Sequence, residues 1–219
     1  MTGLLVVLAL QSPVVDEGTL VVRDDTAEVA REAFRLVAGR VGTGIPGWTL
    51  TTTIRYDRVR PVVALAPILE VGRDSAPVGL QYDVSGREPV RILGQLGGGR
   101  FTVRVLSPGS ERAREFPAAR ATVVLDDSVF ALYTLVAWRA GPTPATLTAI
   151  VPRGLRRESL TVQDHGPEPT VLNRDPATLR HVTVTGGLNQ LVHLWLGEGG
   201  RLMKVEIPSR RLTAERAGL

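Results

Sequence analysis

The chain contains no cysteine among its 219 residues, and only 5% of its residues are aromatic. The absence of cysteine excludes disulfides, thiolate catalysis, cysteine-ligated zinc and a lipid-modified N-terminal cysteine. Histidine is scarce as well. His181 and His193 can at best pair across one hairpin, whereas a zinc site needs three or four converging ligands. We therefore expect neither a metal site nor another cofactor.

Lysine is nearly absent, because Lys204 is the only one. The formal charge of +4 and the pI near 10.3 therefore come from arginines, which are interleaved with nearly as many acidic residues. Nucleic-acid-binding proteins carry a basic stripe with stacking aromatic side chains, and the sequence shows neither. We expect a mixed, solvated surface and no nucleic-acid partner.

Signatures of catalysis are missing too. No Gly-x-Ser-x-Gly motif is present, and the Gly97-Gly98-Gly99 run lacks the Lys-Ser/Thr pair of a phosphate loop, which favours a hairpin turn. Asp126 and Asp127 are in principle a catalytic carboxylate pair, but as capping residues of a following helix they need no further role. These absences favour a non-enzymatic protein, with an enzyme of unrecognised type as an alternative.

The apolar run at residues 3–10 is too short for a membrane span, which needs about 20 residues. It resembles the hydrophobic core of a secretory signal, with Gln11 or Ser12 near the cleavage point. The basic segment that normally precedes such a core is missing, so a first strand is the alternative. We predict that residues 1–12 are a signal peptide or its remnant and that residues 16–216 form a single β-rich domain.

The body of the chain is a series of alternating segments joined by short turns. From Trp48 to Tyr56 apolar and polar residues alternate in a β-branched run, which is typical of a half-buried strand. Near the C-terminus, alternation on both sides of the glycine-rich turn at residues 197–200 predicts a β-meander that ends at Pro208. Further strands are predicted at residues 19–23, 62–71, 78–84, 90–96, 101–106, 146–151 and 158–164.

Residues 28–37 fit two structures. A helix is favoured by local propensity, with Thr26 as its N-cap and Gly39 as its end. A strand places the even-numbered residues from Ala30 to Leu36 on one face and the odd-numbered ones on the other. The residues alone leave this choice open.

One segment breaks the β pattern, because residues 128–138 carry no charged side chain. Asp126 and Asp127 precede it and provide an N-cap and favourable charge for the helix dipole. Apolar residues occupy nearly every helical face, as in a helix buried on most sides. We predict one buried helix over about residues 127–138, either filling the concave side of a curved sheet or forming one wall of a hydrophobic pocket.

Several segments together resemble a family of uncharacterised bacterial envelope proteins. The resemblance is carried by residues 18–36, 114–117 and 125–130, and above all by residues 198–208, which read Glu-Gly-Gly-Arg-Leu-Met-Lys-Val-Glu-Ile-Pro. It implies a half-barrel like that of the lipoprotein-localisation carriers, an antiparallel sheet curled around a helix, and thus a strand at residues 28–37. It also implies a periplasmic or exported location, with the cytoplasm as the alternative if residues 1–12 are not a signal. It transfers no functional residues.

The predicted fold is all-β and mainly antiparallel, a strongly curved meander or half-barrel sheet of about 10–13 strands with one buried helix. The expected function is that of a non-enzymatic envelope protein holding a lipid or other hydrophobic molecule between sheet and helix, in a cavity of roughly 300 Å³ or more. A structural or protein-interaction module with a filled core is the alternative. The predicted ligand-binding residues are Phe130, Leu132, Tyr133, Trp138 and Trp195.

Overall fold

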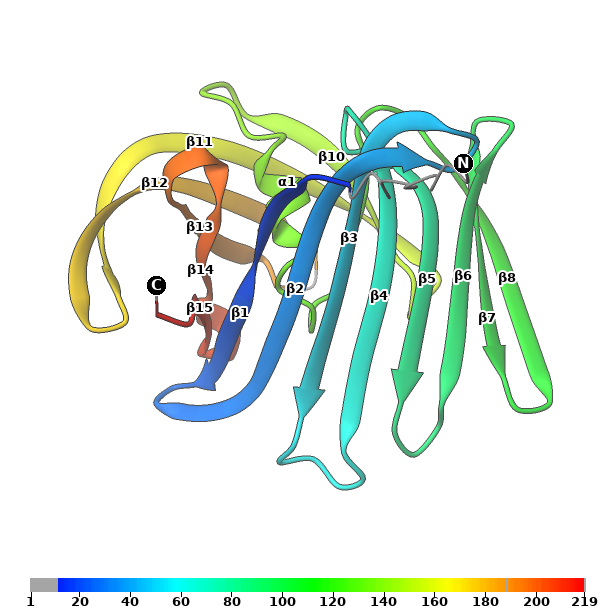
Figure 1. Ribbon diagram of the computed structural model, residues 1–219, viewed down its shortest axis with the longest axis horizontal. Coiled ribbons are helices and arrows are strands. Elements are labelled where there is room, and N and C mark those ends of the chain that lie inside the picture. Colours follow the sequence, from blue (N-terminus) through cyan, green and yellow to red (C-terminus); the bar gives the residue numbers. More distant parts are fainter. Residues whose placement is uncertain (1–11, 188, 219) are drawn as a thin grey trace, which may run out of the picture.

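One curved sheet dominates the computed structural model, which describes residues 12–187 and 189–218 (Figure 1). The predicted leader at residues 1–12 therefore lies, apart from Ser12, outside the described residues. The strands are β1 Val14–Asp24, β2 Ala27–Val41, β3 Ile45–Tyr56, β4 Val63–Gly72, β5 Pro77–Ser85, β6 Val90–Gly97, β7 Arg100–Ser107, β8 Ser110–Pro117, β9 Thr122–Val124, β10 Ala145–Val151, β11 Arg156–Leu172, β12 Asp175–Gly186, β13 Leu191–Leu196, β14 Leu202–Ile207 and β15 Leu212–Arg216.

The order of strands across the sheet explains its curvature. Within the described residues the sheet has fifteen strands, ordered β8-β7-β6-β5-β4-β3-β2-β1-β15-β14-β13-β12-β11-β10-β9, and only the β9/β10 pair is parallel. The two edge strands, β8 and β9, are consecutive along the chain and joined by residues 118–121. Arg114 of β8 also donates a hydrogen bond to the carbonyl of Leu155, 2.9 Å away. The edges are thus held near each other and the sheet curls, which confirms the predicted all-β, mainly antiparallel fold class.

Alternation along β2 and β3 decides which side chains face the interior. In β3, Leu50, Thr52 and Ile54 face the interior, while Thr51 and Thr53 point outward. In β2, Phe34 and Leu36 do the same. The ambiguous segment 28–37 is therefore a strand, as the resemblance implied. It pairs with β1 on one side and β3 on the other, and this tertiary pairing overrides the local preference for a helix.

Three strands were not predicted, which is why the sheet exceeds the expected 10–13. Strand β8 is almost entirely exposed and carries charges on both faces, so it has no apolar alternation to detect. Strand β9 has only three residues. Strand β15 follows Pro208, which ends β14 as predicted but begins a 3-10 turn, Pro208–Arg210, rather than ending the sheet. Its partners are β14 and β1, so β15 joins the two halves of the chain.

The prediction of a helix over about residues 127–138 is wrong in its length. The helix α1 spans Tyr133–Ala137, and its N-cap position, Leu132, makes no side-chain capping bond. Asp126 does not cap it: its Oδ1 accepts the backbone N–H of Ser128 at 2.9 Å and so forms a local turn. Overlapping turns, each closed by a hydrogen bond from the N–H of residue i+3 to the carbonyl of residue i, then lead into α1. No helix in the described part of the chain is long and apolar enough to cross a bilayer.

The concave face is filled by the segment that contains α1, which lies inside the curve of the sheet in Figure 1. Phe130, Leu135 and Val136 are completely or almost completely buried there against the inward rows of the strands. Room for the core depends in part on Gly94 in β6. A Cβ at this position would lie 2.6 Å from Cζ of Phe101 and 2.9 Å from Cβ of Leu80.

Replacing Gly94 by alanine is therefore expected to lower the free energy of unfolding by about 1 to 3 kcal/mol, because the added methyl group overpacks a dense core. Gly97→Ala, on the same strand, is the matched control, since a Cβ there meets no atom within 4 Å. Urea unfolding of both variants measures the difference. Equal stabilities would show that Phe101 and Leu80 move aside at no cost.

Candidate functional site

The segment from Asp126 to Trp138 crosses the concave face along β3. At its beginning the Tyr56 hydroxyl donates to the carbonyl of Ser128 at 2.8 Å. At its end the ring of Trp138 meets Trp48 edge to face, with ring centroids 5.1 Å apart. Tyr56 and Trp48 lie near opposite ends of β3, on its inward row. The two ends of the segment therefore form two distinct sites, one polar and one aromatic.

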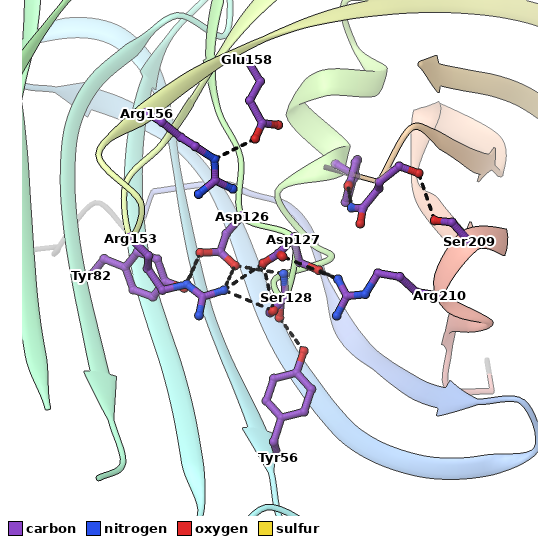
Figure 2. A network of polar contacts seen from close by, with 12 residues as sticks. Tyr56, Tyr82, Asp126, Asp127, Ser128, Arg153, Arg156, Glu158, Ser209 and Arg210 are labelled. Carbon is purple, nitrogen blue, oxygen red and sulfur yellow. Dashed lines mark hydrogen bonds and ion pairs between the residues drawn. The ribbon is translucent and has the colours of Figure 1, made fainter. Parts of the chain in front are cut away.

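The polar site is centred on Asp126, whose side chain is completely buried (Figure 2). Arg153 binds it with two bonds, from Nε to Oδ2 and from Nη2 to Oδ1, each 2.6 Å long. The Tyr82 hydroxyl donates to Oδ2 at 3.0 Å. Burial, together with the charge of Asp126, raises the pKa of Tyr82, so this hydroxyl stays protonated and continues to donate. With the Ser128 N–H on Oδ1, each carboxylate oxygen accepts two hydrogen bonds.

Asp127 extends this network toward the rim. Its Oδ1 accepts from Arg153 Nη2 at 2.9 Å and from the Ser128 hydroxyl at 3.1 Å. Its backbone carbonyl accepts from Arg210 at 2.7 Å. The two aspartates are thus bridged by one guanidinium rather than by a shared proton. Both oxygens of Asp126 and Oδ1 of Asp127 already accept hydrogen bonds from protein donors, which suits the pair to anchoring the segment rather than to proton transfer.

Glu32 holds the middle of the segment. This residue of β2 is completely buried, and its carboxylate accepts the backbone N–H groups of Phe130 at 2.7 Å and Ala131 at 3.1 Å. The Thr52 hydroxyl donates to it at 2.7 Å. Burial raises the pKa of Glu32 to about 7, although these three donors oppose the shift. Both protonation states fit, since the Thr52 hydroxyl can instead donate to the Ala33 carbonyl at 3.1 Å, and its oxygen can then accept a hydrogen bond from the protonated carboxyl of Glu32.

The aromatic site is an open cleft of about 570 Å³ at the other end of the segment. Among the described residues, neither the indole N–H of Trp48 nor that of Trp138 has a protein partner. Both N–H groups reach solvent, because the Thr134 hydroxyl is the only fully buried side-chain donor or acceptor without a partner in this part of the chain. Arg139 donates to the carbonyls of Asp74 and Arg120. The residues lining the cleft are Val15, Trp48, Arg73, Asp74, Ser75, Trp138 and Arg139.

The structure brings together only some of the predicted ligand-binding residues. Phe130, Leu132 and Tyr133 are at most 1% exposed within the core. Tyr133 borders a small, partly open space of about 20 Å³, room for little more than a water molecule, and its hydroxyl accepts from Asn189 at 3.0 Å. Trp138 alone of the five lines the aromatic cleft. A ligand role for the three core residues stays a prediction.

Trp195 lies elsewhere, because Val192, Leu194 and Leu196 are the residues of β13 that face the core. Its ring stacks on His181 at 4.2 Å between centroids, on the opposite face of the sheet. His181 Nε2 and His193 Nδ1 are 2.9 Å apart, so the pairing across the hairpin that the sequence allowed does form. Within the described residues no three histidine or acidic side chains converge as a metal site would require.

Sequence reasoning missed Glu32, Trp48 and Arg153 as members of these sites. Glu32 had a usable signal, because a lone acid within the inward apolar row of a strand must find partners when buried. Trp48 was recognised as inward-facing but not as the neighbour of Trp138. Arg153 had no signal, since its position beside Asp126 depends on how β9 and β10 pair.

Comparison with known proteins yields a likeness of fold. No family model matches the chain, and no curated protein matches it in sequence. Among solved structures, a β-barrel-like protein of domain of unknown function DUF1849 from Brucella abortus superposes with a TM-score of 0.55 at 12% identity, covering 92% of this chain and 95% of that chain. This confirms a fold shared with a bacterial protein of unknown function.

Proposed function

We propose that the protein is a non-enzymatic envelope protein that binds the apolar part of a lipid or similar amphipathic molecule in the cleft between Trp48 and Trp138. The observation that carries the proposal is the cleft itself, where two partly exposed indole rings line a space of about 570 Å³ between the residues that follow α1, residues 73–75 and the sheet. This is within the range of small-molecule sites. Tryptophan is well suited to such a position, since it offers a large apolar surface together with one hydrogen-bond donor.

The proposal keeps the predicted ligand class and moves its site. The sequence placed the ligand between the sheet and the whole of residues 128–138, but the structure fills that space with buried side chains. The end of the segment, at Trp138, borders an open cleft. A periplasmic or exported location and a likeness to the lipoprotein-localisation carriers are part of the proposal. They are supported by the apolar run at residues 3–10 and by the resemblance of residues 198–208.

A structural or protein-interaction module is the second candidate, favoured by the dense packing of the concave face. The two candidates differ in what they predict for the Trp48–Trp138 cleft. A module needs no ligand there, and its aromatic pair would serve only to close the end of the core.

Quenching of tryptophan fluorescence by a spin-labelled fatty acid tests the proposal. The Trp195→Phe variant retains Trp48 and Trp138 and is expected to show saturable quenching. The Trp48→Phe/Trp138→Phe variant retains only Trp195, on the opposite face of the sheet, and is expected to show none. Saturable quenching in the second variant, or its absence in the first, would place the ligand elsewhere or remove it, and the module would then be the better description.

A further inference from the structure

The charges around the aromatic cleft point to the chemistry of its ligand. We infer that the ligand is an amphipathic anion, an apolar chain with one carboxylate or phosphate group, and that Arg73 and Arg139 hold this group at the rim. The inference rests on the proposed function and specifies the chemical class of the ligand.

Arg139 is already positioned for such a contact. Its two terminal nitrogens donate to the carbonyls of Asp74 and Arg120, which fixes the guanidinium at the cleft without neutralising it, since the residue forms no ion pair with another described residue. A guanidinium has five N–H donors, so Arg139 retains donors for a further acceptor. Arg153 and Arg210, the two arginines of the polar site, by contrast pair with carboxylates.

Arg73 adds a second uncommitted cation. Its side chain is exposed, lines the same cleft, and has neither an ion pair nor a hydrogen bond with another described residue. The single acid of the cleft is Asp74, and one of its oxygens already accepts the backbone N–H of Ala76 at 3.2 Å. Two cations against one acid leave an excess of positive charge at the rim.

The hydrogen-bonding groups match an acceptor-rich ligand as well. Both indole N–H groups and both guanidinium groups are donors without acceptor capacity. A carboxylate or phosphate accepts several such bonds, and charge-assisted bonds are stronger than neutral ones. The apolar chain would lie against the rings of Trp48 and Trp138 and against Val15, which is 39% exposed.

The test compares probes that share a chain and differ in head group, using the Trp195→Phe protein so that only the cleft tryptophans report. Spin-labelled stearate at pH 8 is expected to bind roughly tenfold more tightly than its methyl ester. Arg73→Gln should weaken stearate binding by roughly fivefold, the scale of an exposed ion pair, and leave the ester unchanged. Arg120→Gln is the matched control, because Arg120 contacts Arg139 through its carbonyl and not its side chain.

The outcomes distinguish a failure of the anionic-ligand inference from a failure of the proposed function. Equal affinity for acid and ester, or equal loss in Arg73→Gln and Arg120→Gln, would overturn the anion inference and leave an apolar site in place. Binding of neither probe would overturn the proposed function itself. A spin-labelled lysophosphatidic acid distinguishes the two sources of negative charge. Tighter binding than stearate, lost in Arg73→Gln, would support the inference with phosphate as the head group.

Discussion

Replacing Asp126 by alanine is expected to destabilise the protein by about 3 to 5 kcal/mol, because it removes the carboxylate that binds Arg153 through two hydrogen bonds in a largely buried site and leaves only the contact with Asp127. The same change removes the acceptor of the Tyr82 hydroxyl and of the Ser128 N–H. Since Arg153 is 34% exposed and water can reach part of it, the lower end of the range is the more appropriate. For a chain of 219 residues this corresponds to a melting temperature lower by roughly 6 to 20 °C.

Asp127→Ala is the control for this prediction. Asp127 is adjacent in sequence, has the same charge and also contacts Arg153, but its side chain is 31% exposed. Pairs of this kind contribute roughly 0 to 1 kcal/mol. Urea or thermal unfolding of both variants would measure the contrast. Equal and small effects would show that Asp126 is not the anchor of the segment that fills the core.

The second large effect is expected at Glu32. Its replacement by alanine removes the acceptor of two buried backbone N–H groups, those of Phe130 and Ala131. An unsatisfied buried donor costs about 1 to 3 kcal/mol, so the total is roughly 2 to 6 kcal/mol. Glu28→Ala provides the control on the same strand, because Glu28 is exposed and paired only with Arg31. Its expected effect is within about 0.5 kcal/mol.

The cost of Glu32→Ala should also depend on pH. The folded-state pKa of Glu32 is about 7, above its ordinary value of 4.5, so the folded protein binds the proton more tightly than the unfolded chain. The stability that Glu32 contributes is therefore fully present below pH 4.5 and decreases as the pH rises through 7. Unfolding at pH 5 and pH 8 should show a larger cost at pH 5, by up to roughly 3 kcal/mol. A larger cost at pH 8 would mean that the three hydrogen bonds lower the pKa more than burial raises it.

Together these predictions describe a segment that packs its apolar side chains inside the sheet and is also held by polar side chains from distant parts of the chain. The Asp126 and Glu32 anchors lie at the beginning and middle of the segment, while its end at Trp138 borders the open cleft. Ligand binding at the cleft is therefore expected to leave the anchors intact. Variants at Arg73 should change affinity with little change in stability, whereas variants at Asp126 and Glu32 should change stability first.

The sequence by itself determined the elements whose signal is local. The alternation in Trp48–Tyr56 identified β3 and its inward face correctly, because a strand has a period of two and one buried face. The glycine-rich turns were equally clear. Gly98 and Gly99 both have positive φ between β6 and β7, as a hairpin turn requires and as a phosphate loop preceding a helix would not.

Where a pattern was ambiguous, only the tertiary structure decided. The β13 sequence Leu-Val-His-Leu-Trp-Leu is apolar on both faces, so it does not show which row is inside, and Trp195 proved to lie on the outer one. The apolar run after Asp126 suggested a long helix, but α1 has only five residues. Glu32 binds the N–H groups of Phe130 and Ala131, which are 98 and 99 residues away in sequence. Periodicity is a property of neighbours along the chain, whereas these partners meet only because the sheet curls, and its curl depends on pairings between β1 and β15 and between β9 and β10 that no local pattern encodes.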